Sequence, residues 1–373
     1  MKVHILANDR ASFIKPMAEG LSRMLAGLGA TPVVHLDGLS RLMLRQRLDT
    51  SSLRSLGGSL LRLREAHVKL DELTDQLRDA DVLVVVANVP MSFSPSLLPN
   101  IEVLRQRLPE LPIVNYDLHY LPTMDSWARF LLRGEKTKFG REYLAVFDRG
   151  KFGLERYDWY LMASVATELS LPPGPHPYSM IGLDLDDGSL FPDQRGRFRV
   201  VVDFPQSRGD FPSFRAIQLE ALDRAGVDVT VLNRPYSIEE VRSVYRQSSI
   251  FLMASAEAFG LPICELQACG SLIFLPDPLW ASAHWLGNDF YAVREPVLSS
   301  NFVIYDNIAE SLAARIAVAA SEMNPAAVRA TLEQVQPQFL RGDREALAKF
   351  LDKVQSGAIH SRLHSEHSAI GNH

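Results

Sequence analysis

The feature that most constrains the fold is a series of short apolar runs that alternate with longer helical stretches. The run 82–87, VLVVVA, is apolar at every position, as expected of a central strand covered by helices on both faces. Equivalent runs predict strands at 3–7, 32–36 and 112–116, and again at 199–203, 227–232, 250–253, 271–275 and 302–305. This alternation predicts repeated β-α-β units and parallel sheets.

Amphipathic or polar stretches between these runs predict the helices. They cover 13–28, 52–77, 97–108, 213–225, 237–247, 263–269 and 307–321. The predicted fold class is therefore α/β with two doubly wound, Rossmann-like domains, and ligands are expected at the carboxyl ends of the strands.

A length of 373 residues also suits two domains. The stretch 171–197 is rich in Pro, Gly and Asp, which is typical of a linker. It divides the chain into a first domain, 1–187, and a second, 188–335. Residues 355–373 are polar and aperiodic, which predicts a flexible tail, and the irregular spacing of its histidines argues against a metal site.

Composition excludes several classes of protein. A net charge of -5 provides no general basic field for nucleic acid. The longest uncharged stretch, 82–101, contains three prolines and cannot be a spanning helix, and no secretory signal peptide is apparent. Cys264 and Cys269 form neither a disulfide framework nor a metal-binding set. A cytoplasmic protein is the simplest interpretation.

The stretch 248–277, SSIFLMASAEAFGLPICELQACGSLIFLPD, predicts a strand, a loop and a helix in which Pro262 occupies the first turn. Free amides and the positive end of the helix dipole favour an anion such as a diphosphate, by about 0.3–1 kcal/mol when exposed and up to about 2 kcal/mol when partly buried. Glu257 lies in the loop, and Glu265 lies eight positions later in the helix.

The segment EAFGLPICELQACG resembles the two-glutamate signature of the retaining GT-B glycosyltransferases of family four, E-[SGA]-F-G-L-P-x-x-E-A-x-A-C-G. The resemblance implies that Glu257 holds hydroxyls of the transferred sugar and that Glu265 accepts hydrogen bonds from the nucleotide ribose. It also implies that the backbone of Phe259, Gly260 and Leu261 approaches the donor. An arbitrary glutamate pair is more often solvent-exposed and without a ligand, but the complete pattern between a strand and a helix favours a functional site.

The same resemblance covers the stretch before the signature and the passage YSMIGLDLDDGSLFP, and it is thin over the first half. It implies two domains that face a cleft, with a last helix, 336–354, that packs back on the first domain. The activity implied is sugar transfer from a nucleotide diphosphate donor to an acceptor hydroxyl, with retention and with neither metal nor cofactor. The implied partners are a nucleotide sugar and a glycan, lipid-linked or protein acceptor.

The sequence departs from the family at its phosphate-binding residues. Phe204 stands where the family has an arginine that clamps the diphosphate. Arg208 and, in reserve, Arg215 are the candidates to supply the missing charge, the alternative for Arg208 being a solvated surface arginine. The first glycine-rich loop of the family is also absent, and ANDRASF, residues 7–13, stands in its place.

Two further segments have a functional and a plain structural interpretation. His119, in a loop-like segment after a first-domain strand, is a candidate partner of the donor sugar or the leaving phosphate, although a lone histidine is more often structural. Residues 40–67 are rich in arginine and leucine, which allows peripheral contact with an anionic membrane at the inner face. An ordinary helix with leucines toward the core is the favoured alternative.

Two other functions remain open. The missing arginine at Phe204 leaves room for a degenerate relative that binds a sugar nucleotide or a partner without transferring sugar. Another GT-B enzyme, such as a sugar-nucleotide epimerase or a phosphorylase, is the second alternative. Donor base, donor sugar, acceptor, linkage and oligomeric state are not determined by the sequence.

Overall fold

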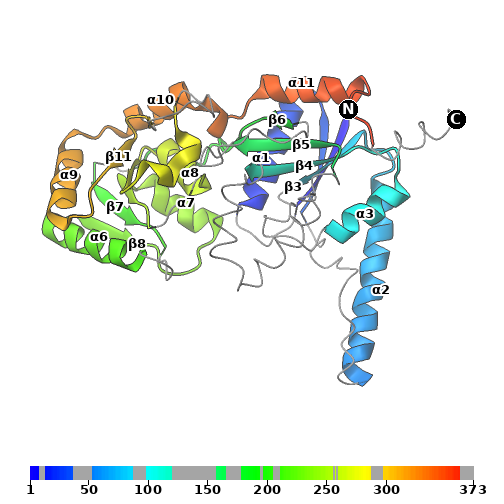
Figure 1. The fold of residues 1–373 in the computed structure, drawn as a ribbon, viewed down its shortest axis with the longest axis horizontal. Coiled ribbons are helices and arrows are strands. Elements are labelled where there is room, and N and C mark those ends of the chain that lie inside the picture. Colours follow the sequence, from blue (N-terminus) through cyan, green and yellow to red (C-terminus); the bar gives the residue numbers. More distant parts are fainter. Residues whose placement is uncertain are drawn as a thin grey trace. The chain divides into compact units, whose positions relative to one another are not determined.

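The chain folds into two compact units (Figure 1). Unit 1 comprises Met1–Ser164, Pro172–Leu183 and Asp343–His373, and unit 2 comprises Val165–Leu171 and Asp184–Gly342. The computed structural model describes residues 1–7, 13–36, 53–86, 98–119, 157–164, 178–193, 196–204, 211–254, 257, 259–286 and 297–361.

Unit 1 is built on a six-stranded parallel sheet in the order β2-β1-β3-β4-β5-β6. Its strands are β1 (Lys2–Leu6), β2 (Thr31–His35), β3 (Val82–Val86), β4 (Ile113–His119), β5 (Trp159–Ser164) and β6 (Tyr178–Met180). Its helices are α1 (Ile14–Gly27), α2 (Leu53–Gln76), α3 (Leu98–Arg107) and α11 (Arg344–Gln355). The last of these, α11, packs against α1 and β6. The final helix of the described chain therefore belongs to the first unit.

Unit 2 contains a five-stranded parallel sheet in the order β11-β10-β9-β7-β8. Its strands are β7 (Arg199–Val202), β8 (Asp228–Val231), β9 (Ile250–Leu252), β10 (Leu272–Leu275) and β11 (Phe302–Ile304). Its helices are α6 (Phe211–Ala225), α7 (Ile238–Arg246), α8 (Leu261–Ala268), α9 (Ala309–Glu322) and α10 (Pro325–Val335), with the 3-10 segments η4 (Pro278–His284) and η5 (Pro337–Phe339). Strand order reverses between β7 and β9, which is the position at which doubly wound sheets bind ligands.

The core of unit 2 follows from its strand sequences. Val200 and Val202 of β7, Ile250 and Leu252 of β9 and Phe274 of β10 are fully buried and pack with residues of α6 and α9. Helices α6 and α9 contact each other, and α7 contacts α8, which in turn contacts α10 (Figure 1). Apolar strands covered by helices are the expected structure of a parallel sheet.

Each half of the chain confirms the predicted α/β class. The observed strands lie within or close to the runs that the sequence predicted, and α1, α2, α3, α6, α7, α8 and α9 lie in the predicted helical stretches. The prediction omitted β5, β6 and α10, since their sequences are short or lack clear alternation. The units divide between Leu183 and Asp184, four residues before the boundary predicted at 187/188, and between Gly342 and Asp343, seven residues after the one predicted at 335/336. Residues 336–342, which the sequence assigned to the last helix, therefore belong to unit 2.

Residues after α11 continue to pack on unit 1 within the segment 355–373 predicted as a tail. Ile359 and Ser361 are buried, and Arg105 donates a 3.2 Å hydrogen bond from Nη1 to Ser361 Oγ. Residues 362–373 lie outside the described part of the chain.

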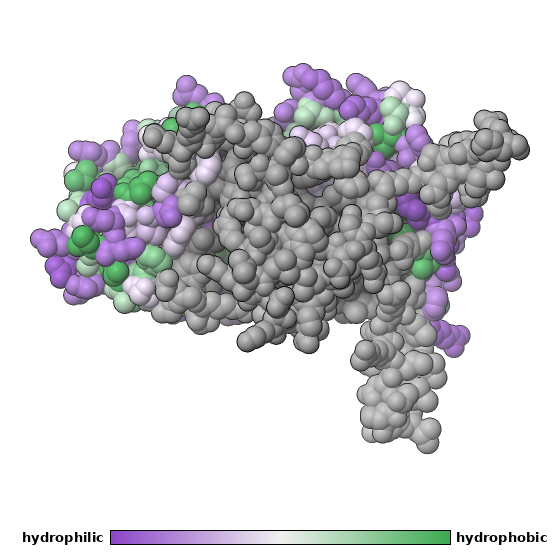
Figure 2. Space-filling view, viewed as in Figure 1, coloured by the Kyte–Doolittle hydropathy of each residue, from purple (hydrophilic) through white to green (hydrophobic). Residues whose placement is uncertain are grey.

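The described helices give no indication of a membrane span. None of them is both long enough and apolar enough to cross a bilayer. On the face that Figure 2 shows, the described residues form hydrophilic areas with small hydrophobic areas among them. Exposed apolar side chains include Leu219, Ile308 and Val318. Peripheral contact through 40–67 stays a prediction, because the side chains of 40–60 lie outside the described residues.

Gly270, directly after α8, provides a test of the packing in unit 2. Its φ is +84°, and a Cβ built there would lie 2.6 Å from Cβ and 2.7 Å from the carbonyl oxygen of Pro325 at the start of α10. We expect Gly270→Ala to lower the free energy of unfolding by about 3 kcal/mol or more, because left-handed strain and a backbone clash add.

Gly226→Ala is the matched control for this variant. Gly226 has a φ of +61° with open space around its Cα, so only the conformational cost of about 1–2 kcal/mol applies. Urea unfolding measures both free energies, and equal losses would contradict the close approach of α8 and α10.

Candidate functional site

The candidate site lies at the carboxyl ends of β7 and β9, on either side of the point where the strand order reverses. Asp203 directly follows β7, and its Oδ2 accepts a 3.4 Å hydrogen bond from the amide of Ala254 after β9. Its Oδ1 accepts a 2.7 Å hydrogen bond from the amide of Phe204. Burial raises the pKa of the Asp203 carboxyl, and these two amides oppose the rise.

Helix α8 begins at this end of the sheet without a side-chain cap. Gly260 is its N-cap residue, in an extended conformation, and Pro262 lies in the first turn. The amides of Gly260 and Leu261 make no hydrogen bond to the described residues. By contrast, Ser237 and Glu240 close a complete capping box on α7. The start of α8 is therefore chemically suited to an anion, whereas that of α7 is already satisfied.

Glu257 lies over the start of α8. A Cβ built on Gly260 would lie 2.6 Å from Glu257 Oε2, so only glycine leaves room for the carboxylate in this position. The Glu257 amide donates a 3.0 Å hydrogen bond to the carbonyl of Trp280, which connects the loop to η4. Glu257 is exposed, but desolvation by the protein atoms around its carboxyl raises the pKa of that carboxyl to about 7, and the Asp203 charge adds to the rise.

An aromatic cluster supports the same loop. The Phe259 ring stacks on His284 of η4, with centroids 5.5 Å apart and planes 12° apart, and Phe339 of η5 contacts both rings. His284 is fully buried, and burial lowers its pKa to about 4 although Gln336 opposes the shift. The His284 imidazole is therefore uncharged at neutral pH and can pack against Phe259 of the loop as an apolar ring.

Glu265 is the one charged residue of α8, a helix whose side chains are almost all buried. Its Oε1 accepts hydrogen bonds from Arg242 of α7, 2.9 Å from Nε and 2.7 Å from Nη2. Arg242 Nη1 also donates to Asp187 Oδ2 at 2.5 Å and to Ser189 Oγ at 2.9 Å. The buried carboxylate is therefore paired, which a charge in such surroundings requires.

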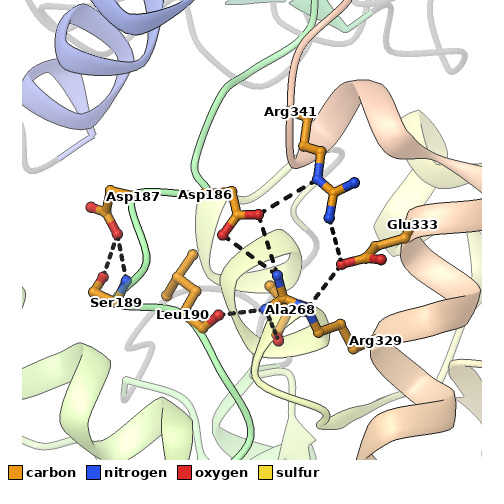
Figure 3. Close-up of polar contacts among 8 residues, drawn as sticks. All are labelled: Asp186, Asp187, Ser189, Leu190, Ala268, Arg329, Glu333 and Arg341. Atoms are coloured by element: carbon orange, nitrogen blue, oxygen red, sulfur yellow. Dashed lines mark hydrogen bonds and ion pairs between the residues drawn. The ribbon is translucent and has the colours of Figure 1, made fainter.

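A second arginine fixes the other end of α8 (Figure 3). Arg329 of α10 donates from Nη1 to the carbonyl oxygens of Ala268, at 3.0 Å, and Leu190. Its Nε lies 2.9 Å from Glu333 Oε1, and its Nη2 lies 3.3 Å from Asp186 Oδ2. A positive charge at a helix C-terminus interacts favourably with the dipole, so Arg329 stabilises α8 where its carbonyls emerge.

The structure brings together the predicted residues of the loop and of α8: Glu257, Phe259, Gly260, Leu261 and Glu265. Arg215 of α6 also reaches this end of the sheet, since its Nη2 donates to the carbonyls of Asp203 and Phe204. Its Nε is buried without a partner among the described residues.

Other predicted residues cannot be placed in this site. Arg208 and residues 8–12 lie outside the described residues. His119 ends β4 of unit 1, and its side chain is likewise outside the described part. Among the described residues, no group of three His, Cys, Asp or Glu side chains could hold a metal ion.

Arg242 and Asp203 were not predicted from the sequence as residues of the site. Arg242 follows Ile238 by four positions and precedes the buried Tyr245 by three, so helical spacing places it on the buried face of α7. A lone arginine on such a face indicates a buried acidic partner. Asp203, one residue after a predicted strand, could have been found from its position at the strand's carboxyl end.

The fold is similar to that of several solved structures, whereas no family model and no curated protein matches the sequence. UDP-GlcNAc 2-epimerase from Neisseria meningitidis bound to UDP-GlcNAc is 12% identical, covers 95% of this chain and 100% of its own, and has a TM-score of 0.50. A ugt transferase from Siraitia grosvenorii in complex with UDP is 10% identical, with coverages of 95% and 99% and a TM-score of 0.49. CalG4, the calicheamicin glycosyltransferase, is 14% identical, with coverages of 95% and 98% and a TM-score of 0.44. At 12% identity the likeness to the epimerase structure shows the fold alone, which agrees with two Rossmann-like α/β domains.

The raised pKa of Glu257 predicts a pH-dependent stability. A glutamate that ionises at its ordinary pKa of 4.5 when unfolded and at about 7 when folded keeps an extra proton in the folded state between these values. The free energy of unfolding should therefore fall as pH rises from about 4.5 to 7, and Glu257→Gln should reduce that fall. Urea unfolding of both proteins across this range measures the difference.

NMR titration of carboxyl-labelled glutamate tests the cause directly. The resonance lost in Glu257→Gln should have a midpoint near 7 in the wild type. Asp203→Asn removes a nearby negative charge and should lower this midpoint. A midpoint near 4.5 in the wild type would refute the proposed environment.

Proposed function

We propose that this protein is a retaining glycosyltransferase that binds a nucleotide-diphosphate sugar in unit 2 and transfers the sugar to an acceptor hydroxyl without a bound metal. One observation carries the proposal: at the strand-order reversal, the Glu257 carboxylate lies beside the start of α8, and Glu265 lies one turn further along the same helix. The signature resemblance and the fold shared with a structure that contains UDP-GlcNAc support it.

The diphosphate would bind to the free amides of Gly260 and Leu261 and to the positive end of α8. Arg215, whose guanidinium lies beside Asp203 with its Nε unpartnered among the described residues, would add positive charge. Arg208 remains a second candidate for that role. These groups would stabilise the negative charge that develops on the diphosphate as the bond to the sugar breaks.

Glu257 would bind hydroxyls of the transferred sugar. With a pKa of about 7, it can either accept or donate a hydrogen bond near neutral pH. In a front-face reaction, the acceptor oxygen bonds to the anomeric carbon on the side from which the diphosphate leaves, and the acceptor proton passes to a departing phosphate oxygen. This route gives retention without a protein nucleophile. His119 is proposed to contact the sugar or the leaving phosphate.

Two alternatives have a specific observation in their favour. An epimerase is favoured by the fold likeness to UDP-GlcNAc 2-epimerase. A non-catalytic binder is favoured by Phe204, which packs edge-on against Tyr236, with centroids 6.1 Å apart, and supplies no charge to a phosphate.

The two glutamates should affect binding and turnover differently. A nucleoside diphosphate that binds only the folded protein stabilises it by about 2.7 kcal/mol at a hundredfold excess over its Kd. Glu265→Ala should abolish the thermal shift produced by UDP, GDP, ADP or TDP and their sugars, because the ribose loses its acceptor. Glu265→Gln, which keeps the volume of the side chain, serves as the conservative control.

Glu257→Ala should retain the shift with the nucleoside diphosphate and lose most of the turnover. An unchanged shift in Glu265→Ala would remove Glu265 from the ribose role, and full activity in Glu257→Ala would remove Glu257 from catalysis.

Product analysis distinguishes the proposed activity from its alternatives. Labelled UDP-, GDP-, ADP- and TDP-sugars are incubated with glycan, lipid-linked and protein acceptors, and the anomeric configuration of the product is determined by NMR. We expect an acceptor-dependent glycoside of retained configuration. An altered sugar nucleotide formed without acceptor would indicate an epimerase, and binding without turnover would indicate the degenerate protein.

A further inference from the structure

The polar contacts of Glu265 are one-sided. Arg242 donates both Nε and Nη2 to the same oxygen, Oε1, at 2.9 and 2.7 Å. Oε2 makes no hydrogen bond to the described residues, and the side chain keeps 8% of its surface exposed. One oxygen is thus held, and the other is available as an acceptor.

Arg242 is itself held from a second direction. Its Nη1 bonds to Asp187 and Ser189, which lie in the segment through which the chain enters unit 2. Asp187 Oδ1 in turn accepts hydrogen bonds from Ser189, 2.9 Å from the amide and 2.6 Å from Oγ (Figure 3). A planar guanidinium fixed by two carboxylates has one orientation, so it fixes the orientation of Glu265 as well.

We propose that Arg242 is a positioning residue that holds Glu265 by Oε1 and presents Oε2 to the vicinal hydroxyls of a nucleotide ribose. This inference rests on the proposed function of unit 2, since it requires a nucleotide ligand. Arg242 itself does not touch the ligand; it acts through Glu265.

The charge on Arg242 also keeps the Glu265 carboxyl ionised, so that it can accept hydrogen bonds. Burial raises the pKa of the Glu265 carboxyl, and the Arg242 guanidinium opposes this rise. Without the guanidinium, the pKa would rise further, and a protonated carboxyl would present a donor in place of an acceptor.

The other titratable groups around Glu265 do not provide this compensation. Asp187 carries the same charge and raises the Glu265 pKa further. Burial raises the pKa values of Tyr245, Cys264 and Cys269, which are therefore uncharged near neutral pH.

The test compares wild type, Arg242→Gln and Arg242→Lys by calorimetric titration with UDP, GDP and ADP, each beside its 2′,3′-dideoxy counterpart. The wild type should prefer the ribose form of the nucleotide that it binds. Arg242→Gln should lose about tenfold in affinity for that form and little for the dideoxy form. Arg242→Lys, which keeps the charge, should recover part of the preference, and it decides the question if Arg242→Gln does not fold.

The pH profile separates positioning from a purely structural role. The affinity of Arg242→Gln relative to wild type should recover as pH rises from 6 to 9, as Glu265 regains its charge. A structural role predicts a constant ratio. Arg199→Gln is the matched control, because Arg199 is also paired with a carboxylate in unit 2, that of Asp228, but does not contact Glu265; its ribose preference should equal that of the wild type.

Each outcome bears on a different claim. If the wild type binds none of these nucleotides, the proposed function and this inference fail together. If the wild type prefers the ribose form and both Arg242 variants keep the full preference at all pH values, the role of Arg242 is overturned while the proposed function stands.

Discussion

Unit 2 depends on the compensation of a single buried charge. Glu265 lies in a helix that is buried on nearly every side, where an unpaired carboxylate would be strongly unfavourable. Arg242 removes this penalty and is in turn anchored by Asp187. This chain of charges joins α7, α8 and the segment that enters unit 2. Removal of either Arg242 or Glu265 would be destabilising, since the remaining partner would stay buried without its opposite charge.

The start of α8 is supported in a different way from its middle and end. An uncharged histidine, stacked on Phe259, forms an apolar base for the loop, whereas Arg329 satisfies carbonyls at the opposite terminus. Neither support engages the amides of Gly260 and Leu261, which make no hydrogen bond to the residues that the structure describes. A rigid helix with an unsatisfied start is pre-organised for a ligand, because the cost of ordering it is met during folding.

The sequence was sufficient to predict the two parallel sheets, since runs such as 82–87 leave few alternatives to a buried strand. The positions of Glu257, Gly260 and Glu265 on one loop and helix could also be anticipated from the spacing of the signature. Arg242 could not be assigned to Glu265, because they are 23 positions apart and meet only through helix packing. The pKa of Glu257 was equally inaccessible, since it depends on surroundings that the sequence does not encode locally.

The path of the chain has a consequence for the order in which the protein can assemble. After Leu183 the chain passes into unit 2, and it returns to unit 1 only at Asp343. At this return the Leu185 amide donates to the carbonyl of Leu340, and the Asp343 amide donates to that of Ile181. Helix α11, which packs on α1 and β6, is therefore synthesised after every residue of unit 2. During synthesis, unit 2 therefore has all of its residues available before unit 1 does, and removal of α11 would take packing from the sheet of unit 1 while leaving unit 2 complete.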